Sequence, residues 1–170
     1  MTSKETKNWT FHHVGVIVED VDKAVEYYKS LGFVDFPAEV EEKDSRPAWE
    51  EITAYGQTVI KDGQPLFPVK PDMKPGRIRF CRMGTVPLEL IEPGNAFQEV
   101  NGDYLKSRGE GIDHIAYTVP AAHFDREVEK MTSKGLAILF SGRQSNGGGF
   151  AYFDTRKVGG IITELMRVPD

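Results

Sequence analysis

The chain has 170 residues, of which 21 are basic and 26 acidic, giving a formal net charge of −5. The absence of any lysine and arginine block argues against nucleic acid as a partner and favours a small molecule. Cys81 is the only cysteine, which excludes an internal disulfide and a cysteine-rich zinc site and leads us to expect a reducing, cytoplasmic location. No run of about 18 apolar residues and no signal-peptide pattern occurs, so we expect no membrane span.

The predicted elements begin with a strand over residues 11–18. Asp20 suits the N-cap of a helix over residues 21–31, in which apolar side chains recur at spacings of three and four, and Gly32 suits its C-terminal end. Residues 35–76 are rich in proline and show no clear period. We expect this excursion to hold one strand near residues 48–53 and to cover part of a site.

Two further strands complete the first half of the chain, over residues 77–83 and 88–93. A short helix is predicted over residues 96–108, and residues 109–111 are expected to form the loop that leads into the second half.

The second half repeats the order of the first. Each half is expected to read β-α-β-β-β, and in the second half the pattern places the first strand, the helix and the last two strands over residues 112–119, 121–134, 149–154 and 163–169. Aligning the two halves pairs His13 with His114 and Glu89 with Glu164. Each half therefore begins with a strand that carries histidine and ends with a strand that carries glutamate.

This repeat predicts an α+β fold in which two tandem β-α-β-β-β modules form a half-open curved sheet with helices on its outer face. The first module is expected over residues 1–95, with the excursion at about 35–76. Residues 96–170 are expected to hold the connecting helix and the second module.

Period-two alternation predicts which side chains face away from the helices. Val14, Val16 and Val18 are expected under the first helix, which sends His13 to the concave side of the sheet. The same alternation sends Glu89, His114 and Glu164 to that side. Two imidazoles and two carboxylates converging away from water require a compensating cation. The sequence therefore predicts one divalent metal ion, and mixed nitrogen and oxygen ligands suit zinc, cobalt, nickel, iron or manganese.

Four motifs also carry a family resemblance, and they read HVGV with AVEYY and GF, then LELIEP, GEGIDHIAYTV and GGIITEL. This set resembles the vicinal oxygen chelate superfamily, which includes glyoxalase I, methylmalonyl-CoA epimerases and extradiol dioxygenases. The resemblance covers nearly the whole chain except the excursion before about residue 76, and it is greatest to the epimerases. It implies the same four metal ligands, His13, Glu89, His114 and Glu164, and a homodimer.

The resemblance implies a metal-dependent isomerase or lyase. The leading expectation is an epimerase that acts on an acyl-CoA-like carbonyl compound through a metal-stabilised enolate. Glu164 and Glu89 are the expected catalytic carboxylates, and Arg79 and Arg143 are expected to bind the substrate. Residues 77–83 offer no second acid, so Glu50 and Glu51 are candidates for that role.

Three other functions remain open from the sequence. A glyoxalase I-like lyase, or another carbonyl isomerase, would be favoured if the excursion built a different pocket. A ring-cleaving dioxygenase would use two histidines and one carboxylate with open positions, and the additional Glu89 would occupy one of those positions. A non-catalytic ligand-binding protein of the bleomycin-resistance kind shares the fold without a metal, and the presence of all four candidate ligands argues against it.

Overall fold

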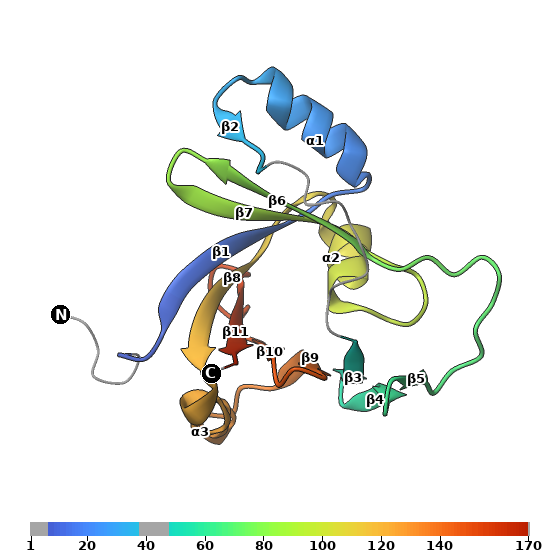
Figure 1. The fold of residues 1–170 in the computed structure, drawn as a ribbon, viewed down its shortest axis with the longest axis vertical. Helices are drawn as coiled ribbons and strands as arrows, with labels where there is room; N and C mark the ends of the chain where they lie inside the picture. The colour runs from blue at the N-terminus through green and yellow to red at the C-terminus, as the bar shows by residue number, and fades with distance from the viewer. Residues whose placement is uncertain (1–6, 38–47, 170) are drawn as a thin grey trace. The chain divides into compact units, whose positions relative to one another are not determined.

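A computed structural model describes residues 7–37 and 48–169 and confirms the mixed α+β class (Figure 1). Its elements in chain order are β1 (Thr10–Ile17), α1 (Val21–Ser30), β2 (Val34–Asp35), β3 (Trp49–Ala54), β4 (Gln57–Lys61), β5 (Gln64–Pro65), β6 (Arg77–Met83), β7 (Val86–Glu92), α2 (Val100–Arg108), β8 (Gly111–Pro120), α3 (Ala121–Ser133), β9 (Ile138–Gln144), β10 (Gly149–Phe153) and β11 (Ile162–Val168). The orders β1-α1-β2-β6-β7 and β8-α3-β9-β10-β11 both match the predicted order of elements, β-α-β-β-β. No helix in the described ranges is long and apolar enough to span a membrane.

The described chain divides into two compact units. The first unit consists of residues 13–37 and 67–114, and the second unit consists of residues 7–12, 48–66 and 115–169. The boundary falls inside β1 and inside β8. The sequence-based division at residues 95 and 96 follows the repeat, and it stays a prediction about modules.

In the first unit the strands follow the order β2-β6-β7-β1-β8. Strand β7 pairs with β1 in parallel and with β6 antiparallel. Helix α1 packs across β2, β6 and β7 (Figure 1). Val14, Val16 and Val18 belong to the core beneath α1, together with Leu88 and Leu90 of β7. The alternation predicted for these two strands is therefore confirmed.

The start of α1 follows the local sequence. Asp20 has an extended backbone, and its Oδ1 accepts hydrogen bonds of 3.1 Å from the backbone N–H groups of Asp22 and Lys23. These two bonds satisfy donors that a helix leaves free in its first turn. Helix α2 begins at Val100, four residues later than predicted.

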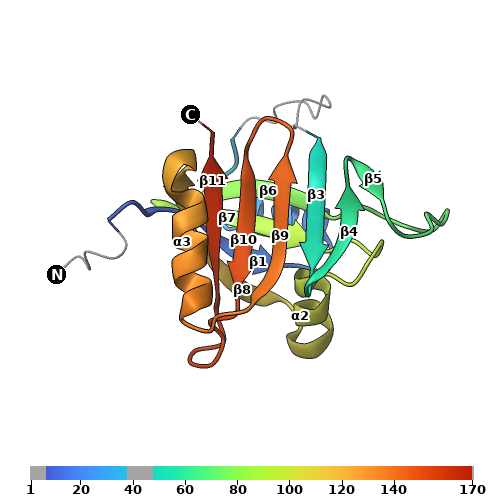
Figure 2. The same ribbon diagram turned by 90° about the horizontal axis from the view of Figure 1, so that it is seen from below.

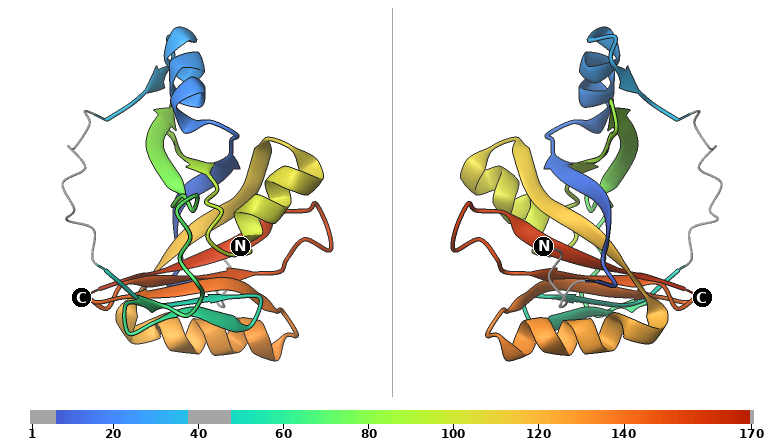
Figure 3. Two further views of the ribbon diagram at one scale, coloured as in Figure 1. Left: turned by 90° about the vertical axis from the view of Figure 1, so that its right-hand side faces the viewer. Right: turned by 90° about the vertical axis from the view of Figure 1, so that its left-hand side faces the viewer.

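In the second unit the strands follow the order β8-β11-β10-β9-β3-β4-β5, and Figure 2 shows β11, β10, β9, β3 and β4 side by side. Helix α3 lies along one face of these strands (Figure 3). The core on that side contains Val119, Ala151, Phe153 and Leu165, with Tyr117 packed against it. Leu165 and Tyr117 therefore point toward α3, as the alternation predicts.

The proline-rich excursion contains three strands where the sequence predicted one, and residues 38–47 lie outside the described residues. Strand β3 pairs with β9 of the second unit, and β4 and β5 extend the sheet from there. Two tight turns make these hairpins possible. Tyr55-Gly56 and Asp62-Gly63 all have positive φ values, between 48° and 77°. Such pairs match the twist of two-residue hairpins, so Asp62-Gly63 was a usable signal in the sequence.

The free cysteine of this fold is expected to be chemically inert. Cys81 of β6 is 2% exposed in the core beneath α1, and burial raises the pKa of its thiol to about 11. At pH 8 only about one molecule in a thousand would carry the reactive thiolate. We expect a thiol reagent to leave the native protein unlabelled at pH 8 and to label it once urea unfolds it. Labelling at equal rates in both states would contradict this expectation.

Candidate metal centre

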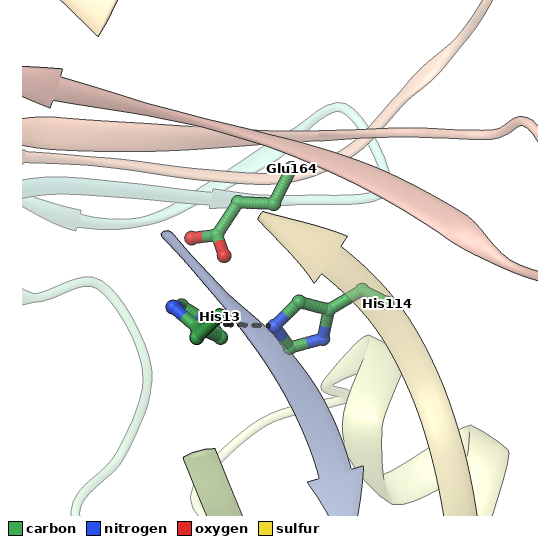
Figure 4. Close-up of side chains that lie close together, drawn as sticks. All are labelled: His13, His114 and Glu164. Carbon is green, nitrogen blue, oxygen red and sulfur yellow. Dashed lines mark hydrogen bonds between the residues drawn. The ribbon is translucent and has the colours of Figure 1, made fainter. Parts of the chain in front are cut away.

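Two buried histidines from neighbouring strands meet in the first unit. His13 of β1 is 1% exposed and His114 of β8 is fully buried. Their Nε2 atoms lie 3.1 Å apart, and the ring planes meet at 79° (Figure 4). Two imidazole nitrogens this close must share a proton or a cation, because their lone pairs would otherwise face each other.

Glu89 of β7 joins the two imidazoles. Its backbone lies beside Gly15 in the parallel pairing of β7 with β1. Its Oε2 lies 3.0 Å from His13 Nε2 and 3.6 Å from His114 Nε2. Burial would raise the pKa of this carboxyl, but the imidazoles of His114 and His13 beside it outweigh burial and lower the pKa to about 2. The group is therefore a carboxylate, held where positive charge is required.

Gly15 makes the approach of His114 possible. A Cβ atom added at Gly15 would lie 1.9 Å from Cε1 and 2.3 Å from Nε2 of His114. The imidazole therefore occupies the space that any other residue at position 15 would fill with its side chain. The glycine of the HVGV motif is thus part of the geometry of this cluster.

The three donor atoms fit a single divalent cation. Imidazole nitrogens and carboxylate oxygens bind zinc at about 2.0–2.2 Å, so adjacent ligands in tetrahedral or octahedral geometry lie about 3.0–3.5 Å apart. The observed separations of 3.0, 3.1 and 3.6 Å agree with these values. Two imidazoles and one carboxylate are also a donor set that transition metals prefer. His13, Glu89 and His114 are thus suited to hold such an ion.

Glu164 belongs to β11 of the second unit. It is 4% exposed, and its backbone lies directly opposite Tyr152 of β10. Its neighbour Leu165 points into the core beneath α3, so Glu164 points to the other face of these strands. Figure 4 draws its side chain on β11. The structure therefore brings His13, Glu89 and His114 together in one unit, whereas the participation of Glu164 stays a prediction.

Sequence comparison decides the family. The sequence profile of the Glyoxalase/Bleomycin resistance protein/Dioxygenase superfamily matches residues 12–153. The chain belongs to this superfamily. Membership agrees with the expected enzyme of the vicinal oxygen chelate type. A search of functionally curated proteins finds no significant match.

Several solved structures are similar to this fold. A hypothetical protein from Bacillus halodurans has 17% sequence identity and a TM-score of 0.61, with 96% of this chain and 97% of that chain covered. Methylmalonyl-CoA epimerase from Mycobacterium tuberculosis has 19% identity and a TM-score of 0.60, with 100% and 93% covered. A methylmalonyl-CoA epimerase variant from Streptomyces coelicolor, solved with 2-nitronate-propionyl-CoA, has 26% identity and a TM-score of 0.51, with 92% and 95% covered.

The register of β6 against β7 corrects the placement of Arg79. Phe80 lies directly opposite Glu89, and residues directly opposite each other in antiparallel strands share a face. Arg79 lies opposite Leu90, which belongs to the core beneath α1. Arg79 is therefore on the helix-covered face rather than the face of Glu89, and its role as a substrate contact stays a prediction. Phe80 takes that place, with its ring centroid 5.8 Å from that of His13.

Arg143 of β9 is also placed differently from the sequence prediction. Its guanidinium lies 3.4 Å from a carboxylate oxygen of Glu50 and 4.0 Å from one of Glu51. Arg143 and Ala151 line a cavity of about 310 Å³ beside α3, on the face opposite the one that carries Glu164. Arg143 is therefore an ion-pairing residue of the helix-covered face, and its role as a substrate contact stays a prediction. Glu50 and Glu51 are its partners, which argues against their use as the missing acid.

Sequence reasoning missed a group of aromatic side chains on the Glu164 face of the second unit. Phe140 and Tyr152 lie opposite each other in β9 and β10, and Phe150 contacts both rings. Trp49 of β3 packs edge-on against Phe150, with ring centroids 5.4 Å apart. A Cβ at Gly142 would lie 2.6 Å from Phe150 and 2.9 Å from Trp49, so glycine is needed there. Period-two alternation in residues 149–154 could have found Phe150 and Tyr152.

Proposed function

We propose that this protein is a metal-dependent isomerase of the vicinal oxygen chelate type that epimerises an acyl-CoA-like compound with an acidic α-carbon. The observation that carries this proposal is the cluster of His13, Glu89 and His114. Its three donor atoms lie 3.0 to 3.6 Å apart in a buried site. Buried donors at these separations are characteristic of ligands that share one ion.

We further propose that Glu164 is the fourth ligand, because it is the repeat partner of Glu89. A divalent cation at this site would stabilise the negative charge that develops on a substrate carbonyl when the neighbouring carbon loses its proton. His13, His114 and Glu89 would hold that ion in place. The Glu164 carboxylate would accept the proton from the α-carbon, and a second acid on the opposite face of the enolate would deliver a proton there, which inverts that carbon.

The acyl-CoA class rests on likeness to known epimerases. The Streptomyces coelicolor epimerase variant was solved with an acyl-CoA analogue, and another methylmalonyl-CoA epimerase was solved with methylmalonyl-CoA. Two of the Streptomyces coelicolor structures are 26% identical to this chain and cover 92% of it. This similarity supports proton transfer next to a thioester carbonyl as the leading reaction.

A second candidate is a glyoxalase-like lyase or another carbonyl isomerase with a bulkier substrate. It is favoured by the aromatic face of the second unit, to which the excursion contributes Trp49. Four aromatic side chains near Glu164 would suit a large apolar or aromatic substituent better than a methyl group. The two candidates share the cation and the enolate, and they differ in the substrate and in the carbon that receives the proton.

Solvent exchange separates these functions. The full chain would be stripped with a chelator, reloaded with zinc, cobalt, nickel, manganese or iron, and incubated in D₂O with methylmalonyl-CoA and a small acyl-CoA panel. We expect deuterium to enter the α-position only with the reloaded protein. Parallel incubation with a methylglyoxal–glutathione adduct tests the second candidate. Exchange that is equally fast in the stripped protein, or absent from every acyl-CoA in the panel, would overturn the epimerase proposal.

A further inference from the structure

The residue before His114 carries a buried carboxylate that the proposed reaction does not use. Asp113 is fully buried in β8 of the first unit. Its Oδ2 lies 3.3 Å from Nδ1 of His114, on the side of the ring away from Nε2. Its Oδ1 is buried and has no hydrogen-bond partner among residues 7–37 and 48–169. A buried carboxylate with so little compensation is costly, which calls for a functional explanation.

We propose that Asp113 is a positioning residue that holds His114 in the tautomer able to bind the cation, an inference that rests on the proposed metal site. An ionised carboxylate only accepts hydrogen bonds, so the proton of the neutral imidazole must lie on Nδ1. Nε2 of His114 then keeps its lone pair. Nε2 is the atom that faces His13 and Glu89.

The two ends of the His114 ring are thus coupled. A cation bound at Nε2 would draw electron density from the ring and strengthen the Nδ1–H hydrogen bond to Asp113. The bound cation would in turn offset the charge of a carboxylate that has little other compensation. Asp113 and the cation therefore stabilise each other through the imidazole, and neither contact requires Asp113 to touch the substrate.

The local backbone explains why this contact is unusual. Adjacent residues in a strand point to opposite faces, so a carboxylate next to a histidine in sequence is not normally its partner. Gly15 lets the His114 ring lie close to the backbone of β1, since no side chain occupies that space. The repeat partner of Asp113 is His12, so the second histidine strand has a carboxylate where the first has an imidazole.

The tautomer is measurable without any metal. Long-range ¹H–¹⁵N NMR on the metal-free full chain, with ¹⁵N-labelled histidine, reports which ring nitrogen carries the proton. We expect His114 in the wild type to be protonated on Nδ1. In the Asp113→Asn variant the amide can donate to Nδ1, so the Nε2-protonated form should grow. A wild-type His114 protonated on Nε2 would overturn the inference, whatever the protein binds.

The second test of the role of Asp113 measures metal affinity. Zinc and cobalt dissociation constants, measured by competition with a chelator, should rise about 10- to 100-fold in Asp113→Asn. The matched control is Asp125→Asn, the same chemical change at an exposed position of α3, and it should keep wild-type affinity. The melting temperature of Asp113→Asn in chelator should stay close to that of the wild type, since the change removes a buried charge.

These two tests distinguish failure of the proposed role of Asp113 from failure of the proposed metal site. A wild-type protein that binds no metal would overturn the proposed function, while the NMR experiment still decides the role of Asp113. Wild-type affinity retained within twofold in Asp113→Asn would overturn the positioning role and leave the metal site standing. A metal-free Asp113→Asn protein that is destabilised while its metal affinity is unchanged would assign Asp113 a purely structural role.

Discussion

Gly15→Ala should abolish cation binding, because the added methyl group would lie 1.9 to 2.4 Å from three atoms of the His114 ring. Such contacts cannot be relieved by a small shift, since His114 is fully buried and the methyl group is fixed to the backbone of β1. The imidazole must rotate away, which separates its Nε2 from His13 and Glu89. We expect zinc or cobalt affinity to fall by more than about 100-fold, a larger loss than removal of a supporting hydrogen bond causes. Competition with a chelator measures it.

Gly102→Ala is the matched control for this change. Gly102 lies in α2 of the same unit, and a Cβ there would meet only Pro93, at an ordinary contact distance of 3.8 Å. Alanine should even stabilise the helix, by up to about 1 kcal/mol. The control should bind cations as the wild type does. A Gly15→Ala protein with wild-type affinity would show that His114 is not a ligand in the conformation described.

Glu89→Leu should cause the second large loss of cation affinity, by removing a charged ligand rather than by a steric clash. The leucine fills a similar volume but offers no oxygen to the cation, and it removes the carboxylate whose Oε2 lies 3.0 Å from His13 Nε2. We expect cation affinity to fall by more than about 100-fold and the α-proton exchange to disappear with it. The rise in melting temperature that a saturating metal gives the wild type should also be lost, since that rise reports binding to the native state.

Glu89→Gln tests whether the oxygen ligand at this position is sufficient without the negative charge of the carboxylate. An amide oxygen still reaches the cation, but it carries no negative charge. We expect Glu89→Gln to retain measurable zinc binding, weaker than the wild type and much tighter than Glu89→Leu. Equal affinities in all three proteins would remove Glu89 from the site.

The alternation of apolar residues located the centre because each of its strands has one strongly apolar face. Val14, Val16 and Val18 are unambiguous core residues, so the direction of His13 follows from theirs. The same holds for Glu89, which stands between Leu88 and Leu90. In these strands a shift of one residue in register would turn the valines and leucines away from the core beneath α1, and the hydrophobic pattern excludes that.

Strand β6 shows where the same method fails. Its sequence, Arg77 to Met83, has apolar and basic residues on both faces, so alternation states that Arg79 and Phe80 point apart without saying which faces Glu89. The pairing of Phe80 with Glu89 decides it, and pairing is a property of two strands rather than one. Asp113 was missed for a related reason, because its contact with His114 runs along one strand against the alternation.

The pairing of β3 with β9 has a consequence for the ancestry suggested by the repeat. Strand β3 comes from the first half of the chain, yet it hydrogen-bonds along the side of β9 that β10 does not occupy, and it brings Trp49 against Phe150. A polypeptide starting at residue 96 would expose that side of β9 as an open template for other chains. Duplication of a half-length precursor alone therefore does not account for the present protein, in which a strand from the first half completes the pairing of β9 in the second half.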